Sequence, residues 1–470
     1  MFEPVSVPFW IFALLILFAA IAFLDRIFGP GVRWFFRRRV NTAIDELNAR
    51  LDTRIQPFKL TRKQTLVDQL MYDPHVIAAA EEEAEDQGTP IAVVMKKAER
   101  YAREIVPSFS PLAYFGFGTR ISKWISEIIY RVRLGYIDDE KLKGIDPDAS
   151  VIFVMNHRSN MDYILVTYLA STRTTLSYAV GEWARVFGLQ TLIRAMGAYF
   201  IRRSSGNELY RRVLARYVSM ATREGVTQAV FPEGGLSRDG KLKPPKLGLL
   251  SYMLSDFNPS GARDIVFVPV GINYDRTLED RILTAKQEAE HTGRDFSFKM
   301  GTTLGFVWNL IQRRFGGKLY RMGYACVSFG NPVSMKSWLK ENNIRFDRQS
   351  EKKRFETTQC LGEQLIKQVG DVIPVLPVAL VATVFSENAS ETALSELELK
   401  AAVSDLIDEL EAKRHHVHIP REDLDYAIST GLRMLLMRHV IQAEDGGNYV
   451  QNPDEKILLD YYANSIAHLR

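Results

Sequence analysis

The sequence predicts an α/β protein in which a mixed sheet is flanked by helices, with helical regions at both ends of the chain and one membrane helix near the N-terminus. Three observations carry this prediction: an uncharged N-terminal run, short β-branched runs alternating with helical ones in the middle third, and charged helical segments on either side. We expect a membrane anchor with a basic interfacial segment at 1–40, a helical region at 41–115, the α/β domain at 116–335, and a C-terminal helical domain at 336–470.

The N-terminal run VPFWIFALLILFAAIAFL at residues 7–24 carries no charge. At about 1.5 Å per helical residue it approaches the roughly 30 Å of a hydrocarbon core, so we expect a membrane helix rather than a buried core helix. Arginines interleaved with aromatic residues follow it in the segment RIFGPGVRWFFRRR. Basic residues favour the cytoplasmic side, which predicts a membrane-anchored protein whose body faces the cytoplasm.

Composition excludes several classes of protein. The 60 Lys and Arg against 56 Asp and Glu leave a formal charge of +4, which gives no indication of nucleic-acid binding. Cys326 and Cys360 have no ligand-type spacing, which argues against a disulfide framework or a zinc site and favours a reducing compartment. The close group His415, His416 and His418 is expected on the surface, so we predict no metal site.

Helical signals dominate both flanks of the middle region. Segments such as AIDELNARL and HVIAAAEEEAEDQ in the first flank, and SELELKAAVSDLIDELEAKR in the second, have helical periodicity and few strand formers. A second apolar stretch at 372–385 contains Pro374 and Pro377 and is short for a membrane span. We expect a packed helix or an interfacial contact there.

Six short apolar runs between about 120 and 335 predict the strands of the sheet. They are SVIFVMN, TTLSYAV, AYFIRR, TQAVFPE, DIVFVPVGINY and YACVSFG. Pro269 lies within the fifth run, and because proline lacks an amide donor we expect an edge strand or a bulge there. Strand-then-helix alternation places ligands at the strand ends, where polar residues follow several of these runs.

The first strand is followed by NHRSNMDY, in which His157 and Asp162 are five residues apart. In one continuous helix the two side chains would point about 140° apart, so they meet only if the histidine lies in the loop and the aspartate in the first helical turn. A carboxylate bonded to one imidazole nitrogen leaves the other nitrogen to take a proton from a hydroxyl. The alternative, which spacing does not exclude, is a helix-terminal aspartate beside an ordinary loop histidine.

Two further strands end in basic or glycine-rich segments. Arg202 and Arg203 end the run AYFIRR, and paired guanidinium groups suit a phosphate, although such pairs often lie on a solvated face. The segment FPEGGLSRDGKLKPPKLG offers glycines for close approach to an anion together with several cations, or else a simple glycine turn.

In this order, NHRSNMD, GAYFIRR, FPEGG and FVPV resemble the four motif blocks of the glycerolipid acyltransferase superfamily, and flanking segments are similar to the membrane-bound bacterial glycerol-3-phosphate acyltransferases. The resemblance implies acyl transfer from acyl-CoA or acyl carrier protein to the sn-1 hydroxyl of glycerol 3-phosphate, giving lysophosphatidate, without a metal or a bound cofactor. It implies His157 as the base and Asp162 as its partner. The substrate-binding residues that it implies are Arg202, Arg203, Glu233, Gly234, Gly235, Ser237, Arg238 and Lys246.

One departure concerns the third block, where the family commonly has arginine and this chain has Leu236. A phosphate contact is then either lost or supplied by Arg238 or Lys246, and the exact acceptor stays open. A lysophosphatidate acyltransferase and a non-catalytic phospholipid-binding membrane protein remain the alternatives.

Overall fold

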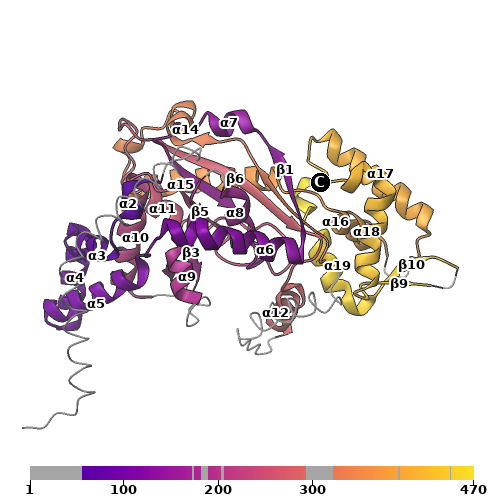
Figure 1. Cartoon of the computed structure of the whole chain (residues 1–470), viewed down its shortest axis with the longest axis horizontal. Helices are drawn as coiled ribbons and strands as arrows, with labels where there is room; N and C mark the ends of the chain where they lie inside the picture. Colours follow the sequence, from indigo (N-terminus) through magenta and orange to yellow (C-terminus); the bar gives the residue numbers. More distant parts are fainter. Residues whose placement is uncertain are drawn as a thin grey trace, which may run out of the picture.

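The computed structural model describes residues 55–171, 174–181, 189–202, 206–292, 321–389, 392–444 and 446–470. A central sheet lies between a group of N-terminal helices and a group of C-terminal helices (Figure 1). The predicted membrane helix at 7–24 lies outside the described residues. Within the described ranges, no helix combines the length and the apolar character needed to cross a bilayer.

The sheet is mixed, as predicted. Its strands are β1 (Arg131–Ile137), β2 (Ser150–Met155), β3 (Ser177–Gly181), β4 (Tyr199–Ile201), β5 (Gln228–Val230), β6 (Ile265–Tyr274), β7 (Tyr324–Phe329) and β8 (Val333–Ser334). They lie in the order β1-β7-β6-β2-β5-β3-β4, with β8 paired to β6. The run from β6 to β4 is parallel, whereas β7 and β8 are antiparallel to β6. All six predicted strands form, and β1 was missed because charged residues interrupt RVRLGYI.

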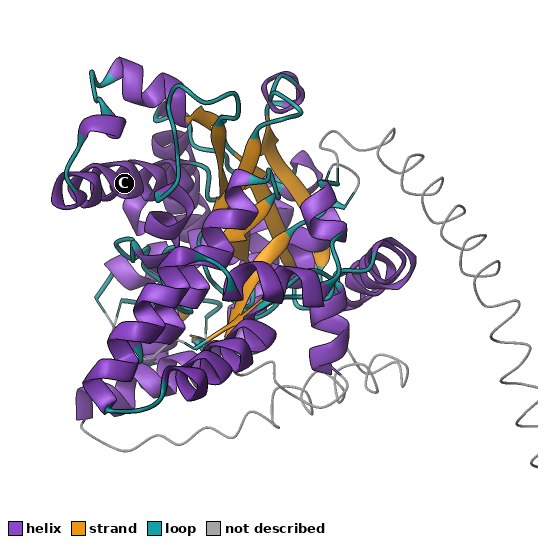
Figure 2. Cartoon of the chain, turned by 90° about the vertical axis from the view of Figure 1, so that its left-hand side faces the viewer, coloured by secondary structure: helices purple, strands orange, loops and turns teal. Residues whose placement is uncertain are grey.

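Helices cover both faces of the sheet (Figure 2). On β2, Val151 and Phe153 face one layer while Ile152 and Val154 face the other, as the period of two requires. The first layer contains α6 (Thr119–Ile129) and α8 (Asp162–Ala170); the second contains α10 (Glu208–Arg223), α11 (Gly248–Leu254) and α15 (Glu351–Asp371). The sheet is therefore buried on both faces.

The N-terminal helices pack against α10, outside the second layer. They are α2 (Pro57–Leu60), α3 (Lys63–Met71), α4 (Pro74–Gln87) and α5 (Ile91–Ile105), followed by the π-helix η1 (Leu112–Gly118). The shorter helices α7 (Asp139–Lys143) and α9 (Leu189–Ala195) connect strands, α12 (Asp280–Thr292) follows β6, and α14 (Met335–Glu341) follows β8.

The C-terminal helices form their own apolar cluster around α16 (Pro377–Glu387). Around it lie α17 (Glu396–Ala412), α18 (Leu424–Leu436), α19 (Lys456–Ala463) and the hairpin β9 (Ile441–Ala443) and β10 (Tyr449–Gln451). The stretch at 372–385 is thus a packed helix, buried from Pro377 to Phe385, as predicted. Helix α15 belongs to the predicted C-terminal domain but also packs on the sheet. The boundaries of the domains stay predictions.

Two expectations were wrong. Pro269 lies in a central strand. On one side of β6 the pairing passes from β8 at Phe267 to β7 at Val270, so Pro269 pairs with neither β7 nor β8. Its missing amide donor is therefore tolerated. His416 and His418 are half-buried rather than on the surface, because residues 416–418 return beside Val375 and the His418 ring packs 5.2 Å from Tyr324. No cluster of possible metal ligands occurs in the described part of the chain.

Candidate active site

The catalytic turn, residues 156–162, leaves β2 through Asn156. The Asn156 side chain donates to the carbonyl of Ile272 and accepts from its amide, both at 2.8 Å, so it takes the place of one more rung of the β2–β6 ladder. The pairing of β2 with β6 ends at Met155, while β6 continues to Tyr274. His157 therefore leaves the sheet at the carboxyl end of β2, where parallel α/β sheets bind their ligands.

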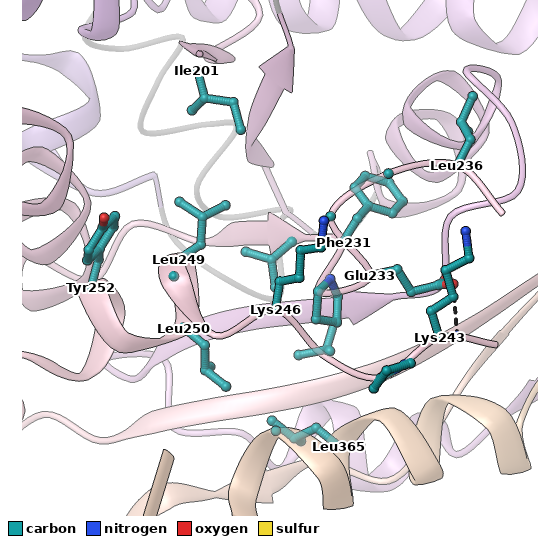
Figure 3. Close-up of a pocket in the computed structure, with 18 of the residues that line it drawn as sticks. Ile201, Phe231, Glu233, Leu236, Lys243, Lys246, Leu249, Leu250, Tyr252 and Leu365 are labelled. Atoms are coloured by element: carbon teal, nitrogen blue, oxygen red, sulfur yellow. Dashed lines mark hydrogen bonds between the residues drawn. The ribbon is translucent and has the colours of Figure 1, made fainter. Parts of the chain in front are cut away.

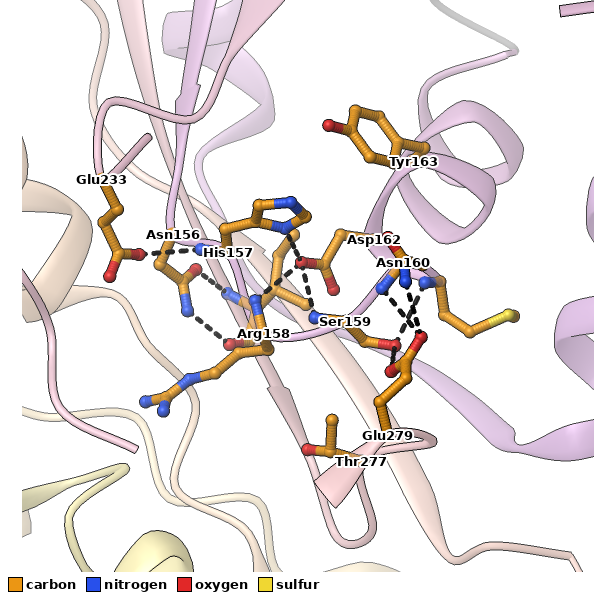
Figure 4. A network of polar contacts seen from close by, with 12 residues as sticks. Asn156, His157, Arg158, Ser159, Asn160, Asp162, Tyr163, Glu233, Thr277 and Glu279 are labelled. Carbon is orange, nitrogen blue, oxygen red and sulfur yellow. Dashed lines mark hydrogen bonds and ion pairs between the residues drawn. The ribbon is translucent and has the colours of Figure 1, made fainter. Parts of the chain in front are cut away.

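His157 and Asp162 meet across this turn (Figure 4). The Nδ1 atom of His157 lies 2.9 Å from Oδ2 of Asp162, and the two side chains are 1% and 0% exposed. Asp162 is the first residue of α8, as the spacing argument requires. Its Oδ2 also accepts from the amides of Arg158 and Ser159, at 2.7 and 3.0 Å. The carboxylate is thereby fixed with its oxygen toward the imidazole.

The second carboxylate oxygen has its own donor. The hydroxyl of Tyr274, at the end of β6, donates to Oδ1 of Asp162 at 2.7 Å. Asp162 thus accepts four hydrogen bonds. This arrangement can stabilise an imidazolium at His157 and keep a proton on Nδ1 while the imidazole is neutral.

The other nitrogen of the imidazole, Nε2, is buried and makes no hydrogen bond to any described residue. The ring packs against Phe231, with centroids 4.1 Å apart, and against Tyr163 at 5.5 Å. A buried nitrogen without a hydrogen-bond partner is uncommon in a folded protein, and a catalytic role is one explanation for it. Its lone pair is available to a substrate hydroxyl.

The loop after β5 closes on the histidine from the other side. Glu233 accepts from the amide of His157 at 2.8 Å and from the amide of Lys243 at 3.2 Å, so its carboxylate joins the two loops. Burial raises the pKa of Glu233 to about 7, against the lowering effect of these donors and of Arg158. Gly234 has a φ of +72°, and an added Cβ would lie 2.5 Å from Cδ of Lys246, so only glycine fits there.

A cavity of about 710 Å³ lies beside this loop, with Phe231 and Glu233 in its wall (Figure 3). His157 does not line it, so the ring of Phe231 separates the imidazole from the cavity. Apolar side chains in its wall include Ile201, Leu214, Leu249, Leu250, Tyr252 and Leu365, and the cations Arg202, Arg238, Lys243, Lys246 and Lys286 line it as well. Such a cavity can hold a ligand with an anionic head and an apolar chain.

The predicted residues divide into three groups. Glu233, Gly234, Gly235, Arg238 and Lys246 line the cavity together. Arg202 also lines it, but its guanidinium forms a bidentate pair with Glu104, at 2.8 and 2.6 Å, between the rings of Tyr101 and Tyr210. Ser237 is buried behind the loop, where its amide donates to the carbonyl of His157 at 2.9 Å. Arg203 lies outside the described residues.

Sequence reasoning missed three residues of this site: Tyr274, Glu279 and Lys286. The first two contact the catalytic turn from beyond the fourth motif, and Lys286 lines the cavity, as does Lys243 of the predicted cationic loop. A signal existed for Tyr274 and Glu279, since Tyr274 ends an apolar strand and Glu279 lies in the polar segment that follows it. No local pattern indicates Lys286, which reaches the cavity from α12.

Comparison with known proteins agrees with the geometry. The family model "Acyltransferase" matches residues 136–273, and the model "Glycerol-3-phosphate acyltransferase C-terminal region" matches residues 307–470. The predicted resemblance to the glycerolipid acyltransferases is confirmed. The acyltransferase match spans His157, Asp162, the loop at 231–246 and the strand through Pro269.

Curated relatives extend this similarity to the N-terminal helices. A glycerol-3-phosphate acyltransferase of Pseudomonas entomophila (strain L48) is 30% identical over 421 residues, which is 87% of this chain and 49% of the relative. One from Pseudomonas putida (strain ATCC 47054) is 29% identical over 423 residues, with the same coverage. The chain spans about half the length of these relatives. A crystal structure of the 1-acyl-sn-glycerophosphate acyltransferase of Thermotoga maritima aligns with 55% of this chain and 78% of its own, at 19% identity and a TM-score of 0.31.

Proposed function

We propose that this protein transfers a fatty acyl group from acyl-CoA or acyl carrier protein to the sn-1 hydroxyl of glycerol 3-phosphate, giving lysophosphatidate. The observation that carries the proposal is the buried His157–Asp162 pair at the end of β2, held at 2.9 Å near a cavity lined by both cationic and apolar side chains. Similarity to glycerol-3-phosphate acyltransferases over 87% of the chain supports the same substrate.

In the proposed reaction, Nε2 of His157 takes the proton of the acceptor hydroxyl while the oxygen of that hydroxyl attacks the thioester carbonyl. The carbon–oxygen bond forms, the carbon–sulfur bond breaks, and the imidazolium returns the proton to the leaving thiolate. Asp162 stabilises the imidazolium through the bond to Nδ1. Phe231 lies between the imidazole and the cavity, so its ring has to turn aside before the hydroxyl reaches Nε2.

The lining of the cavity suits the two parts of the reactants. Lys246 and Lys286 form no ion pair with any described residue, so their charge is available to a phosphate, whereas the charge of Lys243 also acts on the carboxylate of Glu233. Leu236 packs against the C-terminal cluster that includes Leu283 on α12, and Lys286 lies one helical turn after Leu283. We propose that Lys286 replaces the arginine that the family commonly has at position 236.

We also propose that the protein works at the inner membrane with its catalytic site on the cytoplasmic side. The apolar run at 7–24 and the arginines after it support this location. A second support is the exposure of Leu112, Phe117 and Trp124, at 82%, 52% and 44%, with the exposed cations Arg120 and Lys123 between them. Exposed aromatic and basic side chains of this kind favour the interface of an anionic bilayer.

The experiment that tests the proposal incubates the purified full-length chain with labelled glycerol 3-phosphate and either acyl-CoA or acyl carrier protein, and identifies the lipid formed. Labelled 1-acylglycerol 3-phosphate is offered in parallel as the acceptor. We expect lysophosphatidate from glycerol 3-phosphate. Faster acylation of the monoacylated acceptor would assign the chain to the lysophosphatidate acyltransferases, and absence of product with every donor would leave a lipid-binding protein.

A further inference from the structure

Glu279 reaches the catalytic turn from the connection between β6 and α12, outside the four motif blocks. Its Oε2 accepts from the hydroxyl of Ser159 at 2.7 Å, and its Oε1 accepts from the amide and the side chain of Asn160, at 3.3 and 3.0 Å (Figure 4). Ser159 in turn accepts from the amide of Met161 at 3.1 Å. One carboxylate therefore organises the residues that separate His157 from Asp162.

These contacts matter because spacing alone does not bring the histidine and the aspartate together. Their side chains meet only while residues 158–161 keep a turn that is neither helix nor strand. The turn is buried, so its polar groups need partners within the protein. Glu279 supplies the partners on the side opposite to Glu233, which holds the His157 amide.

The cost of burying this carboxylate points the same way. Glu279 is 5% exposed and forms no ion pair with any described residue, and burial raises its pKa to about 7. A buried carboxylate without a cation is unfavourable for stability unless its hydrogen bonds offset the loss of hydration. Each hydrogen bond that it accepts from the described residues comes from the catalytic turn.

The next residue fixes this connection to the C-terminal helices. Asp280 forms a buried ion pair with Arg438, with 2.9 Å from Nη2 to Oδ1, and also accepts from the hydroxyl of Tyr462. The backbone that carries Glu279 is thereby anchored between the sheet and the region matched by the second family model.

We infer that Glu279 is a positioning residue for the acyl transfer proposed for this chain: it holds the turn at 158–161 so that Asp162 and the His157 imidazole stay in bonding geometry. It touches neither substrate nor imidazole. The inference rests on the proposed function only for its kinetic consequence, because the geometry of the pair can be measured without turnover.

The test compares Glu279→Ala, Glu279→Gln and Asp275→Asn in the full-length protein. Asp275 is a matched control, since it is a buried carboxylate on the same connection but accepts from the amides of Tyr324 and Val378 instead of the turn. We expect Glu279→Ala to lower kcat on the order of 100-fold with KM for glycerol 3-phosphate within twofold, because a misplacement of about 1 Å has that effect. Glu279→Gln keeps an acceptor for Asn160 and should retain at least a tenth of the wild-type kcat.

A second readout is the low-field proton resonance of the hydrogen bond between His157 and Asp162. It should shift or disappear in Glu279→Ala and stay in Asp275→Asn. Unchanged kcat and resonance in folded Glu279→Ala would overturn the inference, and so would an equal loss of kcat and resonance in Asp275→Asn. If Glu279→Ala does not fold, the glutamine variant decides. Wild-type KM and resonance in Glu279→Gln, together with less than a hundredth of the wild-type kcat, would also overturn the inference. A wild-type chain without turnover would refute the proposed function alone, and the resonance would then decide the inference.

Discussion

Asp162→Asn is expected to slow acyl transfer by about 10- to 150-fold without disturbing the fold. The amides of Arg158 and Ser159 and Nδ1 of His157 all need an acceptor at the position of Oδ2. The other carboxylate oxygen, Oδ1, faces the hydroxyl of Tyr274. Unlike the two amides and Nδ1, this hydroxyl can accept a hydrogen bond as well as donate one. The asparagine oxygen should therefore face the histidine, and its amide nitrogen should face Tyr274.

This orientation sets the magnitude. The imidazole keeps its proton on Nδ1, so the loss is that of a hydrogen bond to a charged group, about 1.5–3 kcal/mol, rather than the roughly 10⁴-fold loss that follows from a wrong tautomer in serine hydrolases. At about 1.4 kcal/mol per factor of ten, kcat should fall by about 10- to 150-fold.

Initial rates at saturating labelled glycerol 3-phosphate measure this change, with thermal unfolding as the control for folding. A kcat within threefold of the wild type would refute the catalytic role of Asp162, and a loss near 10⁴-fold would refute the assigned orientation of the amide.

Three further predictions concern the loop and the cavity. Burial raises the pKa of Glu233 to about 7, so between about pH 4.5 and 7 the folded protein holds a proton on Glu233 that the unfolded chain has lost. The free energy of unfolding should therefore fall by roughly 3 kcal/mol through this group as pH rises from about 4.5 to above 7. Urea unfolding at pH 5.5 and at pH 8 measures this change. The free energy of unfolding should fall less between the two pH values in Glu233→Gln than in the wild type, and an equal fall in both would contradict the prediction. Lys286→Ala should raise KM for glycerol 3-phosphate about tenfold, because it removes one charge-assisted hydrogen bond to the phosphate. Adding Leu236→Arg to the Lys286→Ala variant should lower KM again. An unchanged KM in Lys286→Ala alone argues against the phosphate contact. Gly240→Ala should destabilise the fold by about 3 kcal/mol or more in calorimetry, because φ is +82° and the new Cβ would lie 1.9 Å from the carbonyl oxygen of Tyr461; a wild-type melting temperature would show that the contact relaxes.

The sequence was sufficient where local chemistry decides the structure. The apolar runs specified the central strands, and the five-residue spacing of His157 and Asp162 was enough to predict a loop histidine facing a helix-starting aspartate. The glycine at 234 was also predictable, since no other residue adopts its backbone conformation beside Lys246 without strain.

Sequence alone was insufficient where the partner is distant along the chain. Arg202 was predicted to bind phosphate, but its partner Glu104 lies 98 residues upstream, and no local pattern links the two. Tyr274 is 112 residues from Asp162 and Glu279 is 120 residues from Ser159, so each contact depends on the order of strands in the sheet. The role of Arg202 in substrate binding stays a prediction.

The central claim is that the imidazole of His157 takes the proton of the acceptor hydroxyl. The most direct measurement compares the wild-type chain with His157→Ala in the labelled glycerol 3-phosphate assay, using samples whose unfolding transitions coincide. The claim predicts lysophosphatidate from the wild type and no turnover above background from the variant. Turnover in the variant within tenfold of the wild type would contradict it.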